Sequence, residues 1–409
     1  MESTGRSRYL ALFGVVYFVQ GAVLTYFATF NKIYLRTFDL SFTRIGIVGG
    51  ITLAPFVLKI FIGLLSDRVC LAGLGYRKPY MVIGLVLQSL AFLLFPLIGP
   101  ATQFPLFVLV CVAAALGMST YDTCADGFSI DVTPEDERAT VQGVMVGGRA
   151  LSMVVSPVVI GWLSERGFWP AVFVGIGVLG LLTVPLVLVA RESKVRPPEQ
   201  AFSASAFRSM LDWAFVLFLV LGLVYPLTLW SANGMSGAFL NEVFGVPLGR
   251  VGLYASVFGI GMVAGGLVGG PLTRRVGRRA SLLGALLLTS ATVSGLALLP
   301  SAGVGWVVMF FFGVAFGYYE TVYMAMGMEF SDPRIAAFMF AFIMAVGNIG
   351  IGLGEPLSGG LTDAFGFRWM FAILAILNLL TLPLVYVVFH LRGKTRRVQG
   401  QLRTSSEGV

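Results

Sequence analysis

Stretches of apolar residues recur along the chain, separated by short polar segments. A helix needs about 20 apolar residues to cross a bilayer core of about 30 Å, and twelve stretches meet this length. They run approximately over Tyr9–Phe30, Arg44–Leu65, Pro79–Gly99, Leu106–Ile130, Thr140–Leu163, Pro170–Ala190, Leu211–Trp230, Val251–Leu272, Ala280–Leu299, Gly305–Met328, Ala336–Leu361 and Arg368–Leu391. The pattern predicts an all-α membrane protein with twelve transmembrane helices.

One loop sequence occurs twice. Residues 63–68 read GLLSDR and residues 75–78 read GYRK, and a degraded copy over 270–279 reads GPLTRRVGRR. A short cationic, glycine-bearing loop at the same place in each half indicates a duplicated bundle whose halves move against each other. We expect six-helix bundles over 1–190 and 211–391, a cytoplasmic linker over 191–210 and a basic cytoplasmic tail over 392–409.

Composition excludes a soluble globule. Hydrophobic residues make up 57% of the chain, charged residues 12%, and the mean hydropathy is +0.88. A protein of this size would have too little polar surface to face water on all sides. The three cysteines have no metal spacing, and no glycine-rich loop has the form of a nucleotide site. We therefore expect no metal, no cofactor and no enzyme active site outside the membrane.

The cationic residues give the orientation. Of the 28 lysines and arginines, 20 lie in the two tails and the even-numbered junctions between helices, and six lie in the odd-numbered junctions. The positive-inside rule then places both termini in the cytoplasm and the chain in the cytoplasmic (inner) membrane. The net charge of +8 is thus a sign of contact with anionic lipid and not of nucleic-acid binding.

Specific residues resemble one known family. The first half reads PFVLK over 55–59, GLLSDR over 63–68, GYRKPY over 75–80 and YDTCADG over 121–127. In these segments the chain resembles the major facilitator superfamily, and in particular its branch of muropeptide permeases, acetyl-coenzyme A transporter relatives and folate-biopterin transporters, with certain siderophore permeases. The resemblance implies a carrier with a central cavity lined by helices 1, 4, 7 and 10. Nothing in the sequence indicates an oligomer, so we expect a monomer.

The repeated loop is a candidate gate. Its residues, with the polar residues that follow helix 4, are Gly63, Asp67, Arg68, Arg77, Lys78, Asp131 and Arg138. We expect Asp67 to accept hydrogen bonds at the start of a helix in the other half, and the cations to pair with the acidic residues leaving helix 4. The alternative is that the cations only obey the positive-inside rule. Arg274 replaces the acidic residue in the second copy, so we expect no symmetrical latch there.

Charged residues within the spans are the main functional candidates, because each costs at least about 2.5 kcal/mol at a helix centre. They are Lys59, Asp122, Asp126, Arg149 and Glu320. We expect the first four to form one buried cluster in which a carboxylate takes up a proton and releases its cationic partner. The alternative is a permanent ion pair that fixes helices 2, 4 and 5. A proton relay must use carboxylates, since the single histidine ends the last helix.

Polar and aromatic residues in the predicted cavity helices are candidates to contact a solute. They are Tyr17, Gln20, Tyr26, Tyr225, Trp230, Asn233, Tyr319, Tyr323 and Glu355. The alternative is that many of the aromatic residues anchor the protein at the membrane interface, and that the glycine-rich run before Glu355 serves close helix packing. The sequence predicts a secondary transporter that imports a polar or anionic small solute with protons. An uncoupled facilitator, an exporter and a nontransporting assembly factor or sensor remain as alternatives.

Overall fold

A computed structural model describes residues 3–71, 75–134, 137–192, 210–330 and 336–392. Among these residues, twelve helical segments are long and apolar enough to cross a membrane, as the sequence predicts. The first half contains α1 (Ser3–Thr25), η1 (Tyr26–Phe30), α2 (Asn31–Arg36), α3 (Phe42–Thr52), α4 (Ala54–Arg68), α5 (Lys78–Leu94), η3 (Phe95–Leu97), α6 (Phe104–Val132), α7 (Arg138–Glu165) and α8 (Trp169–Val189). The second contains α9 (Trp213–Phe244), α10 (Leu248–Val276), α11 (Arg278–Ala297), α12 (Ala302–Phe330), α13 (Ala336–Phe365) and α14 (Phe367–Leu379), and the chain is helical again over 382–392.

The boundaries of three spans differ from the prediction. The first span continues to Arg36 through a π-helical turn, so the polar residues after Phe30 lie inside it. The seventh continues to Phe244, where Gly245 takes the left-handed conformation that ends the helix. The second is two helices, because Pro55 lacks the N–H that a continuous helix would need and so begins a new one.

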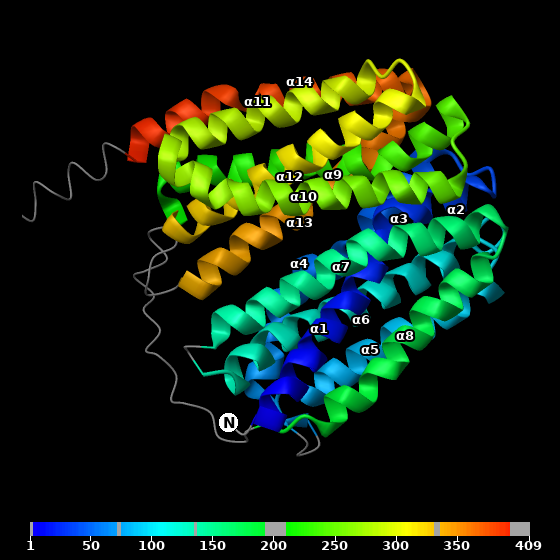
Figure 1. Ribbon diagram of the computed structural model, residues 1–409, viewed down its shortest axis with the longest axis vertical. Coiled ribbons are helices and arrows are strands. Elements are labelled where there is room, and N and C mark those ends of the chain that lie inside the picture. The colour runs from blue at the N-terminus through cyan, green and yellow to red at the C-terminus, as the bar shows by residue number, and fades with distance from the viewer. Residues whose placement is uncertain (1–2, 72–74, 135–136, 193–209, 331–335, 393–409) are drawn as a thin grey trace, which may run out of the picture.

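The two halves form separate bundles that lie side by side (Figure 1). Aromatic packing holds each bundle together from within. In the first half, for example, the ring of Tyr26 lies 5.5 Å from those of Phe92 and Phe173, and in the second Phe239 lies 5.2 Å from Phe371. The predicted linker and basic tail lie almost entirely outside the described residues.

Among the described residues, the contacts between the bundles are concentrated toward one end. We call the end where α4 ends and α5 begins the basic end, and the end where α2 ends and α3 begins the far end. Figure 1 shows the bundles close together around α2 and α3 and diverging toward the end where α1 begins. At the far end, glycines bring the backbones together: a Cβ on Gly50 would lie 2.7 Å from the carbonyl oxygen of Gly352, and one on Gly161 would lie 2.5 Å from that of Leu248.

The contact between α7 and α10 stops toward the basic end. The Ser256 hydroxyl of α10 donates to the carbonyl of Val154 on α7 over 2.6 Å. Two turns further toward the basic end, on the same face of α7, a Cβ on Gly147 would meet no atom within 4 Å, and the same holds for Gly143. The described residues therefore form a structure closed at the far end and splayed at the basic end.

Candidate functional site

The first half holds a cluster of polar residues in its membrane-spanning interior. Asp122 and Asp126 lie one turn apart on α6, facing α1. The Gln20 amide donates to Asp122 over 2.5 Å, and the Tyr17 hydroxyl donates to Asp126. The ammonium of Lys59, on α4, lies 3.7 Å from the other oxygen of Asp122. Two of the expected cavity residues, Tyr17 and Gln20, thus hold the carboxylates of the expected charge cluster.

Arg149 lies at the edge of this cluster, toward the second half. Its guanidinium carbon is 6.0 Å from the centre of the Tyr17 ring, within the range of a cation–π contact. Arg149 is also close enough to interact electrostatically with Asp126 in its own half and with Glu320 on α12. The structure therefore brings Lys59, Asp122 and Asp126 together, with Arg149 against the ring of Tyr17.

The remaining expected cavity residues are mostly enclosed by neighbours in their own half. Tyr26 is fully buried in the aromatic core of the first half, and its hydroxyl donates to Asn31 over 3.1 Å. In the second half the ring of Tyr225 lies 4.7 Å from that of Tyr319 and 4.8 Å from that of Tyr323. In this conformation these rings pack the bundles. Trp230 packs edge-on against Phe316 at 5.2 Å, and Asn233 is buried on α9.

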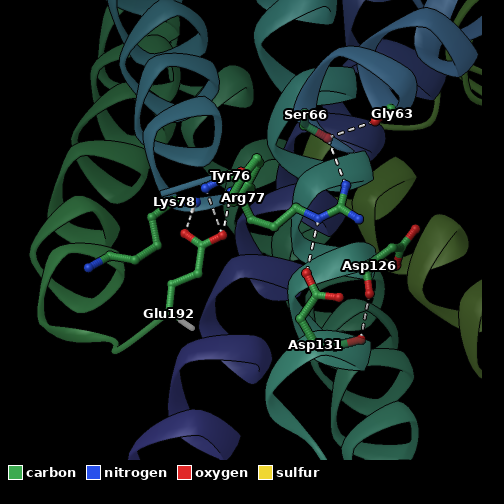
Figure 2. Close-up of polar contacts among 9 residues, drawn as sticks. Gly63, Ser66, Tyr76, Arg77, Lys78, Asp126, Asp131 and Glu192 are labelled. Carbon is green, nitrogen blue, oxygen red and sulfur yellow. Dashed lines mark hydrogen bonds and ion pairs between the residues drawn. The ribbon is translucent and has the colours of Figure 1, made fainter. Parts of the chain in front are cut away.

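Figure 2 shows the network around the repeated loop of the first half. The Arg77 guanidinium lies 3.2 Å from Asp131 at the end of α6 and donates to the Ser66 hydroxyl over 2.7 Å. Glu192, which sequence reasoning missed, accepts hydrogen bonds from the backbone N–H groups of Tyr76, Arg77 and Lys78 over 2.9, 2.7 and 3.1 Å. All of these bonds stay within the first half.

Of the expected gate residues, the side chains of Asp67 and Arg138 lie outside the described residues. The second half does carry a counterpart of the Arg77–Asp131 pair. Arg278, at the start of α11, forms an ion pair with Glu329 near the end of α12, and Arg392 lies 3.5 Å from the same carboxylate. Each half therefore has its own ionic brace at the basic end.

Charged residues that join the halves lie at the far end, and sequence reasoning missed most of them. Lys32 on α2 forms a buried ion pair with Glu355 on α13, at 3.0 Å. Glu355 is thus a charge partner and not an open cavity residue in this conformation. The carboxylate of Asp363, at the end of α13, accepts hydrogen bonds at the start of α3, and Arg36 lies 2.7 Å from Glu242. A longer first helix was the missing signal, since it places Lys32 inside the span.

The chain matches the family model of the Major Facilitator Superfamily over residues 13–355 and 218–407. The chain belongs to this superfamily. The anhydromuropeptide permease of Escherichia coli K12 is 26% identical to it over 349 residues, which are 81% of this chain and 70% of the relative. The human chromaffin granule amine transporter is 24% identical over 368 residues, which are 84% of this chain and 65%, or less than two thirds, of the relative.

Solved structures have the same fold. A bacterial homologue of the human lysosomal transporter Spinster, in an inward-facing and unoccupied conformation, superposes with a TM-score of 0.81 over 96% of this chain and 98% of that one, at 17% identity. The nucleoside transporter NupG superposes with a TM-score of 0.77 over 93% of this chain and 99% of that one, at 14% identity. The protein is a multi-pass membrane transporter with two pseudo-symmetric six-helix halves.

Proposed function

We propose that this protein imports a polar solute with an anionic group together with protons, by alternating access. In this proposal the basic end faces the cytoplasm, because lysine and arginine are concentrated in the segments at that end. The splayed basic end and the closed far end then correspond to a state open to the cytoplasm. In the opposite state the halves would separate at the far end and close at the basic end.

The observation that carries the proposal is the pair of carboxylates on α6. Asp122 and Asp126 are four residues apart in an apolar span, and Lys59 lies within ion-pair distance of Asp122. Two nearby carboxylates are costly to keep ionised together away from water, so one of them favours a proton. Asp122 has the cation Lys59 within ion-pair distance, whereas the hydrogen bond to Asp126 comes from the neutral hydroxyl of Tyr17. A cation stabilises an ionised carboxylate more than a neutral donor does, so we assign the proton to Asp126 and leave Asp122 paired with Lys59.

Arg149 links this proton to the movement of the halves. When Asp126 is ionised, the positive charge of Arg149 is balanced within the first half. When Asp126 takes up a proton, that balance is lost, and Arg149 interacts more strongly with Glu320 of the second half. The proton thus acts as a ligand. Because it changes which carboxylate Arg149 interacts with, it shifts the populations of the two conformations.

The proposed class of solute is based on the positive charges in the first half and on the solutes named for similar proteins. Lys59 and Arg149 offer positive charge near the central region, which suits an anionic group. The anhydromuropeptide permease of Escherichia coli K12 is 26% identical over 81% of this chain and 70% of its own length. Anhydromuropeptides are therefore the first solute class to test. A nucleoside, which carries no anionic group, is the neutral comparison solute, since the fold is also that of the nucleoside transporter NupG.

The test is uptake of labelled anhydromuropeptide and labelled nucleoside into proteoliposomes with an imposed pH gradient, acidic outside. We expect accumulation that follows the gradient in the native protein. Asp126→Asn is expected to lose accumulation but to retain exchange of solute between the two sides, since exchange needs no net proton movement. Asp212→Asn is a matched control, because Asp212 caps α9 outside the cluster and an asparagine also caps.

Three results would contradict the proposal. Uptake that ignores the pH gradient would identify an uncoupled facilitator, in which Lys59 and Asp122 form a fixed pair. Accumulation by Asp126→Asn equal to that of the native protein would remove Asp126 as the proton carrier. Absence of anhydromuropeptide uptake would reject the proposed solute class.

A further inference from the structure

The ion pair between Lys32 and Glu355 differs from the other ion pairs because it joins the two halves and is almost fully buried, whereas the Arg36–Glu242 pair, which also joins them, is about one third exposed. The ammonium of Lys32 on α2 lies 3.0 Å from each carboxylate oxygen of Glu355 on α13, and the two side chains are only 4% and 9% exposed. Lys32 also donates to the carbonyl of Ala28 over 3.1 Å. The pairs Lys59–Asp122 and Arg77–Asp131, in contrast, each lie within the first half.

The surroundings of this pair keep water out in the observed conformation. A Cβ on Gly49 of α3 would lie 2.8 Å from Oε2 of Glu355, and one on Gly234 of α9 would lie 2.5 Å from the nitrogen of Lys32. On the packed faces of α3 and α9, glycines thus stand where a larger side chain would clash with the pair. Among the described residues, Lys32 is the charged group that faces Glu355. The charged residues nearer the far end bind elsewhere: Arg36 pairs with Glu242, and Asp363 accepts hydrogen bonds from α3.

Stability alone does not explain a pair in this place. Replacing a buried ion pair by well-packed apolar residues is often neutral or stabilising, because the charges no longer have to be dehydrated. An apolar contact here would hold the far end shut more strongly. The ion pair attracts the halves when they are together, and water hydrates both charges when they separate, so closure at the far end stays reversible.

We propose that Lys32 and Glu355 are positioning residues for transport that set the balance between the closed and the open far end. They act through the relative position of the halves and need not touch the solute. The proposal rests on the alternating access proposed above, but not on proton coupling or on the identity of the solute.

Three sets of substitutions distinguish this role from a merely structural one. Glu355→Gln leaves the charge of Lys32 buried without a counter-charge, which disfavours closure and shifts the protein toward an open far end. Lys32→Met with Glu355→Met replaces the pair by flexible apolar side chains and shifts it toward closure. Lys32→Glu with Glu355→Lys exchanges the charges and is expected to restore the native balance.

The balance is measured with two reporter cysteines, introduced one at a time into a chain whose native cysteines are replaced by serine. Thr29→Cys reports the far end, since the methyl group of Thr29 faces Gly237 of the other half. Gly147→Cys reports the basic end, where its position is open. The rate of labelling by a polar maleimide is measured in nanodiscs, where the reagent reaches both ends and no assumption about orientation is needed.

Glu355→Gln is expected to raise the labelling rate at position 29 by about tenfold and to lower it at position 147. The double methionine variant is expected to lower the rate at position 29, and the charge-exchanged variant to match the native rates within about threefold. Arg278→Met is the matched control, because it breaks an ion pair within one half and should change neither rate.

The proposal is wrong if Glu355→Gln and the double methionine variant change the rate at position 29 in the same direction, or if neither changes it. Thermal unfolding of each variant shows whether it is folded, and a variant that unfolds is replaced by Lys32→Gln, which leaves Glu355 unpaired and has the same expected effect as Glu355→Gln. All rates are measured without solute or pH gradient. Failure here is therefore distinguishable from failure of the proton-coupled import tested above.

Discussion

Asp363 makes one of the sharpest tests of how the far end stays closed. Its carboxylate, at the end of α13, accepts hydrogen bonds from the backbone N–H groups of Phe42 and Thr43 over 3.0 and 2.7 Å, and from the Thr43 hydroxyl over 2.6 Å. These N–H groups belong to the first turn of α3 and have no partner within their own helix. Asp363 thus caps a helix of the other half.

The size of the effect follows from helix capping. Loss of a capping side chain costs about 0.5–2 kcal/mol. Because Asp363 is exposed to water, we expect its loss to cost about 1 kcal/mol. Water hydrates the same N–H groups when the far end opens, so the loss falls on the closed state alone. Asp363→Ala is therefore expected to lower the ratio of closed to open protein about fivefold.

The labelling rates at Thr29→Cys and Gly147→Cys measure this ratio, with the first expected to rise and the second to fall. Asp39→Asn is the control, since Asp39 is another exposed carboxylate at the far end, and its left-handed backbone suits asparagine. Rates in Asp363→Ala within twofold of the native values, or an equal change in Asp39→Asn, would refute the capping argument.

Three further predictions concern the interior and the basic end. Tyr17→Phe removes the donor to Asp126 and is expected to lower gradient-driven uptake about tenfold while solute exchange persists, which the proteoliposome assay measures. Gly46→Ala forces a methyl group against the backbone of α13 and should raise labelling at the far end, whereas Gly147→Ala, in open space, should leave it unchanged. Arg77→Ala leaves Asp131 without this partner and should lower the thermal unfolding midpoint of the detergent-solubilised protein by several degrees; an unchanged midpoint would mean that the brace contributes nothing.

Much of the fold follows from hydropathy alone, because a bilayer demands long apolar helices. The twelve spans, the duplication and the superfamily could all be predicted. The contact between Lys59 and Asp122 could be anticipated as well, since a charge within a span needs a partner and few are present. The spacing of Asp122 and Asp126 places both on one face of α6, which the contacts of Gln20 and Tyr17 confirm.

The bonds between the halves could not be predicted, for two physical reasons. Polar residues at the edge of an apolar run look like the start of a loop, so the predicted first span ends at Phe30, although the helix continues to Arg36 and includes Lys32. Partners such as Lys32 and Glu355 are more than 300 residues apart, and a sequence does not say which state of a moving protein brings them together. Tyr26 is a further example, since only packing decides whether an aromatic residue faces a solute or other rings.

The ionic braces of the basic end have a consequence for controlling the protein from outside. Arg77 with Asp131, and Arg278 with Glu329, each close within one bundle, so a tilt of one bundle against the other breaks neither. The bonds that would break in the proposed cycle lie where Lys32, Arg36 and Asp363 meet the opposite bundle. In the proposed cycle, an antibody fragment or small molecule bound across that seam would therefore hold the bundles in one arrangement, whereas one bound to the outer side of a brace would move with its own bundle.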